Sequence, residues 1–293
     1  MEQKKTTLHD LTLKNNFMFG AVMTDEENCR RFLELTLGFP IERVQVSRER
    51  SMVYHPEYRG IRLDVYARDE SNTRYNVEMQ VAKFSDLPKR ARYYHSQIDM
   101  ELLLTGEDYR NLPYSYVIFI CDFDPFDKKR YCYHFISRCE EDGELVLGEG
   151  SHTIFLSTCG QNDCEVSGSM VNFLKFVRAN LEESKQDFND EFVKRLQDSV
   201  QRIRQSREME ERYMLFEELL RDERAAGKTE GKAEGKAEGK AEAILLLLED
   251  LSEVPEPLRE KILAVKDPAV LAVMLKQAAK AETMDQFLKE VRL

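Results

Sequence analysis

Three oxygen-bearing side chains stand at spacings that would bring them together on one face of a β-hairpin. Glu78 and Gln80 lie two residues apart in the alternating stretch 75–81, so they share a face, because strand side chains alternate with a period of two. Asp64 lies in the alternating stretch 61–67 and points away from the apolar residues of that stretch. In an antiparallel hairpin, Asp64 comes opposite the 78–80 pair. Two carboxylates and an amide oxygen then converge.

Such a set of oxygens suits Mg²⁺ or Mn²⁺, which prefer hard oxygen ligands. The backbone carbonyl of Met79 is a further candidate ligand. A divalent ion held there would stabilise charge on a phosphate under attack. The spacing alone also fits the polar outer face of an ordinary hairpin, which needs no function.

The elements that must position these residues follow from hydrophobic periodicity and turn signals. Ser71 and Asn72 supply the hairpin turn. The order of helices and strands along the chain predicts an α/β domain with a mixed central sheet flanked by helices. The expected helices cover 8–37 and 86–105, and the expected strands lie near 44–53, 61–67, 75–81, 116–121, 131–136 and 153–156.

After residue 166 the strand patterns stop, and an all-helical tail is expected. Four near-copies of Gly-Lys-X-Glu run from Gly227 to Glu242. They fit either a flexible charged linker or a helix whose glycine stripe packs against a second copy. Leucines on both sides favour the paired helix and predict a homo-oligomer, a dimer, that dissociates without residues 206–293. The expected segments are a nuclease-like domain at 1–165, a helical extension at 166–226, the repeat at 227–243 and a small helical region at 244–293.

Composition narrows the functional classes. Hydrophobic residues make up 42% of the chain and charged residues 33%, with a net charge of −11. Residues 43–92 nevertheless hold eleven basic and seven acidic residues, a net charge of +4, so nucleic acid should approach this window. The apolar runs are too short for a membrane span, which predicts a cytoplasmic protein without a membrane partner.

Six cysteines are scattered along the chain. Their spacing favours reduced thiols over a zinc cluster. The zinc alternative would combine Cys132, His134, Cys139, Cys159 and Cys164.

An ordered set of short motifs resembles the recombination-promoting nuclease/putative transposase family of bacteria, within the PD-(D/E)xK nuclease superfamily. The match covers about residues 8–243, including the Gly-Lys-X-Glu tail. The motifs are Leu13-Lys-Asn-Asn-Phe-Met-Phe19, Ile61-Arg-Leu-Asp64, Asn76-Val-Glu78-Met-Gln80, Arg90-Ala-Arg-Tyr-Tyr94, Gly106-Glu-Asp-Tyr-Arg-Asn-Leu-Pro113 and Val117-Ile-Phe-Ile120.

The resemblance implies a restriction-endonuclease-like fold and a Mg²⁺- or Mn²⁺-dependent site. Asp64 and Glu78 match the metal-binding acids, and Gln80 takes the position of the superfamily's lysine. A neutral amide cannot act as a base or a positive charge, but it can orient a water or bind metal. Leu63 stands where the superfamily has a proline. Glu34, on an expected helix, is a further candidate acid, although a solvated glutamate is the alternative.

Four basic residues follow the acids closely and are candidates for contacting DNA phosphates: Lys83, Lys89, Arg90 and Arg92. The favoured function is a metal-dependent endonuclease on double-stranded DNA that promotes recombination or acts in defence. A DNA-binding or assembly protein with weak or lost chemistry, and a DNA-rearranging transposase, remain as alternatives.

Overall fold

The structure is a computed structural model that describes residues 6–52 and 61–291. It divides into two compact units, residues 1–213 and 214–293. In the described part of the chain, no helix is long and apolar enough to cross a membrane. Residues 166–213 belong to the same compact unit as the sheet.

A six-stranded mixed sheet forms the centre of the first unit, in the order β1-β2-β3-β4-β6-β5. Strands β1 to β3 form an antiparallel meander, β4 and β6 run parallel to β3, and β5 is an antiparallel edge strand. The expected α/β class with a mixed sheet is confirmed. The strands are β1 (Val44–Met52), β2 (Ile61–Asp69), β3 (Arg74–Gln80), β4 (Ser115–Cys121), β5 (Cys132–Phe135) and β6 (Ser151–Ser157).

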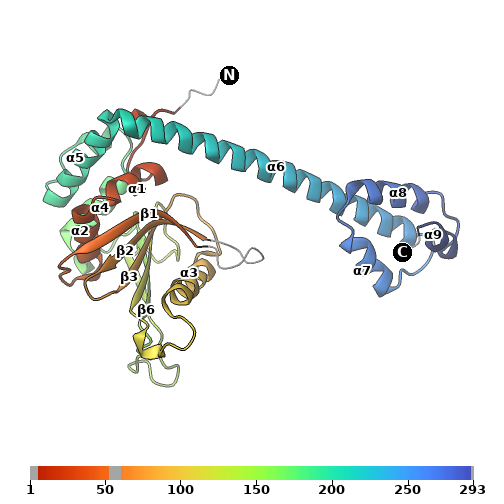
Figure 1. Cartoon of the computed structure of the whole chain (residues 1–293), viewed down its shortest axis with the longest axis horizontal. Helices are drawn as coiled ribbons and strands as arrows, with labels where there is room; N and C mark the ends of the chain where they lie inside the picture. The colour runs from red at the N-terminus through yellow and green to blue at the C-terminus, as the bar shows by residue number, and fades with distance from the viewer. Residues whose placement is uncertain (1–5, 53–60, 292–293) are drawn as a thin grey trace. The chain divides into compact units, whose positions relative to one another are not determined.

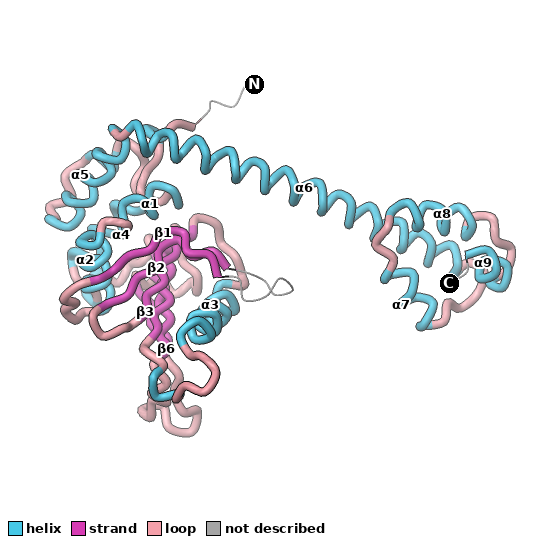
Figure 2. The backbone as a smooth tube through the Cα atoms, in the orientation of Figure 1, coloured by secondary structure: helices cyan, strands magenta, loops and turns pink. Residues whose placement is uncertain are grey.

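Helices cover both faces of the sheet (Figures 1 and 2). On one face, α1 (Asn16–Met23) and α2 (Glu26–Leu37) pack against the sheet, and α4 (Gly168–Arg178) and α5 (Glu191–Gln205) pack against these helices. The other face packs against α3 (Leu87–Leu102), whose apolar side contacts Val117, Phe119 and Phe155. Helix α3 is therefore the element that covers the face carrying the hairpin's polar residues.

The β2–β3 turn forms where the sequence predicts it. Asn72 adopts a left-handed conformation with φ 67°, which asparagine tolerates better than most residues. The Asp69 carboxylate accepts hydrogen bonds from the backbone N–H groups of Ser71 and Thr73, both at 2.9 Å. These contacts set the register that carries Asp64 toward Glu78.

The second unit is helical, and its core draws on the repeat. Helix α6 (Arg207–Glu249) runs through all four copies of Gly-Lys-X-Glu, so the repeat is helical. Ala237 and Ala241, the X residues of the last two copies, are buried in this core. The other helices of the unit are α7 (Glu256–Ala264), α8 (Pro268–Ala278) and α9 (Met284–Val291).

The expected helical extension at 166–226 contains a break at Ser206. Helix α5 ends at Gln205, and Ser206 has an extended backbone. The Ser206 hydroxyl accepts a hydrogen bond from the Met209 N–H at 3.3 Å, which suits the start of a new helix. This single residue separates α5 from α6, and periodicity did not reveal it.

Candidate active site

The two acids meet where strands β2 and β3 separate. Backbone pairing between these strands runs only as far as Val65 and Val77. Beyond that point, residues 61–63 pair with β1 and residues 78–80 pair with β4. The acids therefore lie at a fork between strands that are held by different neighbours.

Side-chain contacts replace the backbone ladder at this fork. The Met79 N–H donates to Asp64 Oδ2 at 3.1 Å, and the Asp64 N–H donates to Glu78 Oε1 at 3.3 Å. Each carboxylate is thus held by the backbone of the opposite strand. The structure brings Asp64 and Glu78 together, and Gln80 follows Glu78 on the same face of β3.

Glu78 is buried, and its charge is poorly solvated. Only 2% of the residue is exposed. Burial, followed by the negative charge of Asp64, raises the pKa of Glu78 to about 8. Two carboxylates in such surroundings favour either a shared proton or a bound cation.

Arg90, on α3, reaches into this site. Its Nη1 donates to Gln80 Oε1 at 3.2 Å, and its Nη2 lies 3.5 Å from Glu78 Oε2. Nη2 also donates to the Tyr94 hydroxyl at 2.8 Å, and the guanidinium lies 5.8 Å from the centre of the Phe119 ring. The sequence suggested Arg90 as a phosphate contact, but here it bridges the acid and the amide.

One feature of the sequence does point to this contact. Arg90 and Tyr94 are four residues apart, so they share a side of α3. Ala91 and Ile98 are buried residues of the same helix. The apolar pattern therefore indicated which side of α3 faces the sheet, although it did not indicate that a guanidinium would reach Gln80.

The other expected basic residues lie outside the acid cluster. Lys89 and Arg92 are exposed on α3. Lys83 is exposed in the segment after β3 and forms an ion pair with Asp127 at 2.9 Å. All three are accessible to a large polyanion, and among the described residues no hydrogen bond or ion pair joins them to Asp64 or Glu78.

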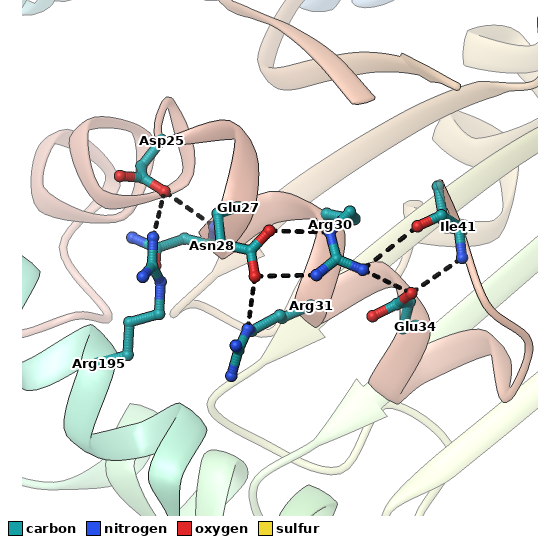
Figure 3. A network of polar contacts seen from close by, with 8 residues as sticks. All are labelled: Asp25, Glu27, Asn28, Arg30, Arg31, Glu34, Ile41 and Arg195. Atoms are coloured by element: carbon teal, nitrogen blue, oxygen red, sulfur yellow. Dashed lines mark hydrogen bonds and ion pairs between the residues drawn. The ribbon is translucent and has the colours of Figure 1, made fainter. Parts of the chain in front are cut away.

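Glu34 is held elsewhere (Figure 3). Its Oε1 accepts from Arg30 Nη1 at 2.7 Å and from the Ile41 N–H at 2.9 Å. These contacts fasten α2 to the segment leading into β1. Because α2 covers the face opposite α3, the structure does not bring Glu34 together with Asp64 and Glu78.

The cysteines do not form the imagined zinc cluster. All six are free thiols. Within residues 6–52 and 61–291, no three His, Cys, Asp or Glu side chains gather closely enough to hold a metal ion. The candidate centre at the fork instead combines two carboxylates with an amide and backbone groups.

A mixed sheet with paired acids at a strand fork defines the class of PD-(D/E)XK-type α/β folds. A family model described as PD-(D/E)XK nuclease family transposase matches residues 4–230. The chain belongs to this family, as the resemblance predicted. Searches of curated proteins and of solved structures each found no match. Family membership supports a nuclease-like or transposase-like function.

Proposed function

We propose that the protein is a metal-dependent endonuclease that hydrolyses phosphodiester bonds in double-stranded DNA. The observation that carries this proposal is the convergence of Asp64, Glu78 and Gln80 at the β2–β3 fork. Family membership supports the same reaction class.

The donor set fits a divalent cation. Asp64 and Glu78 would hold Mg²⁺ or Mn²⁺, with the carbonyl of Met79 as a further ligand. Burial and the negative charge of Asp64 raise the pKa of Glu78, and a bound cation would offset both effects. When bound, the cation supplies charge neutralisation and polarises a phosphate oxygen.

Gln80 and Arg90 divide the tasks of the superfamily's lysine. Because Gln80 Oε1 accepts from Arg90, the amide nitrogen of Gln80 is left as a donor for a phosphate oxygen or a water. The guanidinium of Arg90 supplies the positive charge that Gln80 lacks. It lies within reach of a phosphate placed over the acids, where a charge-assisted hydrogen bond is strong.

The exposed basic residues near the site would hold the DNA backbone. Lys89 and Arg92 share the solvent side of α3, and Lys83 lies in the segment before it. Contacts of this kind position a duplex without reading its sequence.

Supercoiled plasmid incubated with the purified protein tests the proposal. Nicked or linear product should form with Mg²⁺ or Mn²⁺ and disappear with EDTA. Intact plasmid under all metal conditions would refute the endonuclease.

Two observations each favour an alternative function. The neutral side chain of Gln80 favours a DNA-binding protein with weak or lost chemistry, and the family description favours a DNA-rearranging transposase. Binding of duplex DNA without any product would support the first. Joining of a labelled DNA end to a second duplex would support the second.

We further propose that α6 forms a homodimer through its repeat. Glycines at 227, 231, 235 and 239 recur every four residues of a continuous helix, and they permit close backbone approach. The lysine flank of one copy would face the glutamate flank of the other. Among the residues that the structure describes, a Cβ at Gly231 or Gly235 meets nothing within 4 Å in the single chain.

Alanine at these two positions separates the possibilities. In a monomer, each Gly→Ala substitution should stabilise the helix by up to about 1 kcal/mol. In a dimer packed along the stripe, both together should dissociate it. Light scattering measures the oligomeric state of the full-length chain and of a shortened chain that lacks residues 214–293. The shortened chain keeps Tyr213, whose ring packs on Phe17. A full-length monomer at micromolar concentration would refute the dimer.

A further inference from the structure

Asn76 is a buried amide on the same face of β3 as Glu78. The two residues are two positions apart, so their side chains point to the same side of the sheet. Asn76 pairs with Tyr66 of β2 and with Val117 of β4, which places it in the middle of the sheet, just inside the fork. None of the residue is exposed to solvent. Glu78 is thus flanked along β3 by two amides, Asn76 before it and Gln80 after it.

The fold does not satisfy this amide. Among the described residues, no group forms a hydrogen bond with either Nδ2 or Oδ1 of Asn76. A second buried asparagine, Asn28, instead donates from Nδ2 to the Val22 carbonyl and to the Ser199 hydroxyl, both at 3.0 Å. A buried amide without a partner opposes folding, and asparagine is disfavoured within strands. Stability therefore does not explain asparagine at position 76.

The Asn76 amide faces the Glu78 carboxylate. Burial raises the pKa of Glu78 and the charge of Asp64 raises it further, whereas the Asn76 amide lowers it. Oε1 of Glu78 accepts from the Asp64 N–H at 3.3 Å. Oε2 lies 3.5 Å from both Arg90 Nη2 and the Tyr94 hydroxyl. These contacts are long, and an ionised carboxylate offers about four acceptor positions, so Glu78 has capacity for a further donor.

We propose that Asn76 is a positioning residue of the cation site, and that its amide nitrogen donates to ionised Glu78 when this carboxylate binds the cation. Hydrogen bonds to a ligating carboxylate orient it and raise metal affinity. The cation and the amide both favour the ionised form of Glu78, so each interaction strengthens the other. The inference deepens the proposed function and rests on its cation site.

Binding of Mn²⁺ to the full chain without DNA, measured by isothermal titration calorimetry, tests this role. Asn76→Leu replaces the amide with an apolar side chain of similar size, and Asn76→Ala is a smaller second variant. Asn28→Ala is the matched control, because it removes a buried, hydrogen-bonded amide from α2, on the opposite side of the sheet. Glu78→Gln, alone and combined with Asn76→Leu, shows whether Asn76 acts through Glu78. Thermal unfolding in EDTA measures what each substitution does to stability.

Asn76→Leu should weaken Mn²⁺ binding about 10-fold or more, as loss of a hydrogen bond to a metal ligand typically does. It should not lower the melting temperature in EDTA, because an apolar group replaces an unpaired buried amide. Asn28→Ala should lower the melting temperature and leave Mn²⁺ affinity unchanged. In the Glu78→Gln background, Asn76→Leu should cause no further loss of affinity, because the two residues act as a pair.

Mn²⁺ binding of parental strength in both Asn76 variants would overturn this role and leave the endonuclease standing. Equal weakening by Asn28→Ala would assign the effect to a general loss of stability and would also overturn it. A parent whose Mn²⁺ binding depends on Asn76 but which never cuts plasmid would keep the role and lose the endonuclease. A parent that binds no Mn²⁺ would overturn both the cation site and this role.

Discussion

Replacing Glu78 with glutamine should make the metal-free protein more stable at neutral pH. The parent carboxyl holds its proton up to about pH 8, whereas in the unfolded chain it loses it near 4.5. Between these values the folded state binds more protons than the unfolded state, so stability falls as pH rises. The loss is about 1.4 kcal/mol per pH unit, which gives on the order of 3 kcal/mol at pH 7. Glutamine keeps the shape of the side chain and carries no charge.

Urea unfolding in EDTA at pH 5, 6, 7 and 8 measures this effect. The stabilities of parent and Glu78→Gln should be similar near pH 5 and diverge toward pH 8, with the variant more stable. Mn²⁺ should stabilise the parent at pH 8 but not the variant, because a ligand that binds only the folded state adds to its stability. Glu140→Gln, at an exposed loop position, is the control. Curves that stay parallel for parent and Glu78→Gln would show that Glu78 ionises normally.

The other predictions concern residues around the acids. Arg90→Gln should slow plasmid cutting by about 10- to 100-fold, since a hydrogen bond to a charged group contributes about 1.5–3 kcal/mol. Arg90→Lys should retain more activity, and equal rates for the two variants would argue against a charge role. Gln80→Ala should slow cutting less than loss of either acid; complete loss in all cases would refute that ranking. Alanine at both Lys89 and Arg92 should weaken binding to all DNA sequences alike and make the salt slope shallower by about two. An unchanged slope would mean that these side chains face elsewhere.

The alternation of side chains and the turn signal were sufficient to predict the hairpin that carries Asp64 and Glu78. Alternation fixes which side chains share a face, and the Ser71-Asn72 turn fixes the register, so the meeting of Asp64 with Glu78 was predictable. The fork was not predictable from that pattern. Where the β2–β3 ladder stops depends on β1 and β4, which pair with the diverging ends of the strands.

The surroundings of the acids depend on tertiary packing. The alternative view of the hairpin treated its polar face as solvated, but α3 covers it and leaves Glu78 buried. A basic residue on a helix after the acids also fits a surface contact with DNA, which is the role expected of Arg90. Only the packing of α3 on β4 turns its guanidinium toward Gln80.

In the second unit as well, tertiary packing decides which residues of the repeat are buried. Glycine recurs every four residues of the repeat, and this spacing predicted a glycine stripe that packs against a second copy. In the last two copies, the alanines at the X position, Ala237 and Ala241, pack into the core of the second unit. A repeat with a period of four presents several stripes with nearly the same slow drift. Contacts made by later helices decide which stripe is buried.

The most direct test of the central claim is the initial rate of plasmid nicking in Mn²⁺ by the parent, Asp64→Ala and Glu78→Ala, each purified and shown to be folded by circular dichroism. The parent should cut the plasmid and neither variant should cut it above background, because each variant lacks one of the two carboxylates at the fork. Variants that cut as fast as the parent would contradict the assignment of this site.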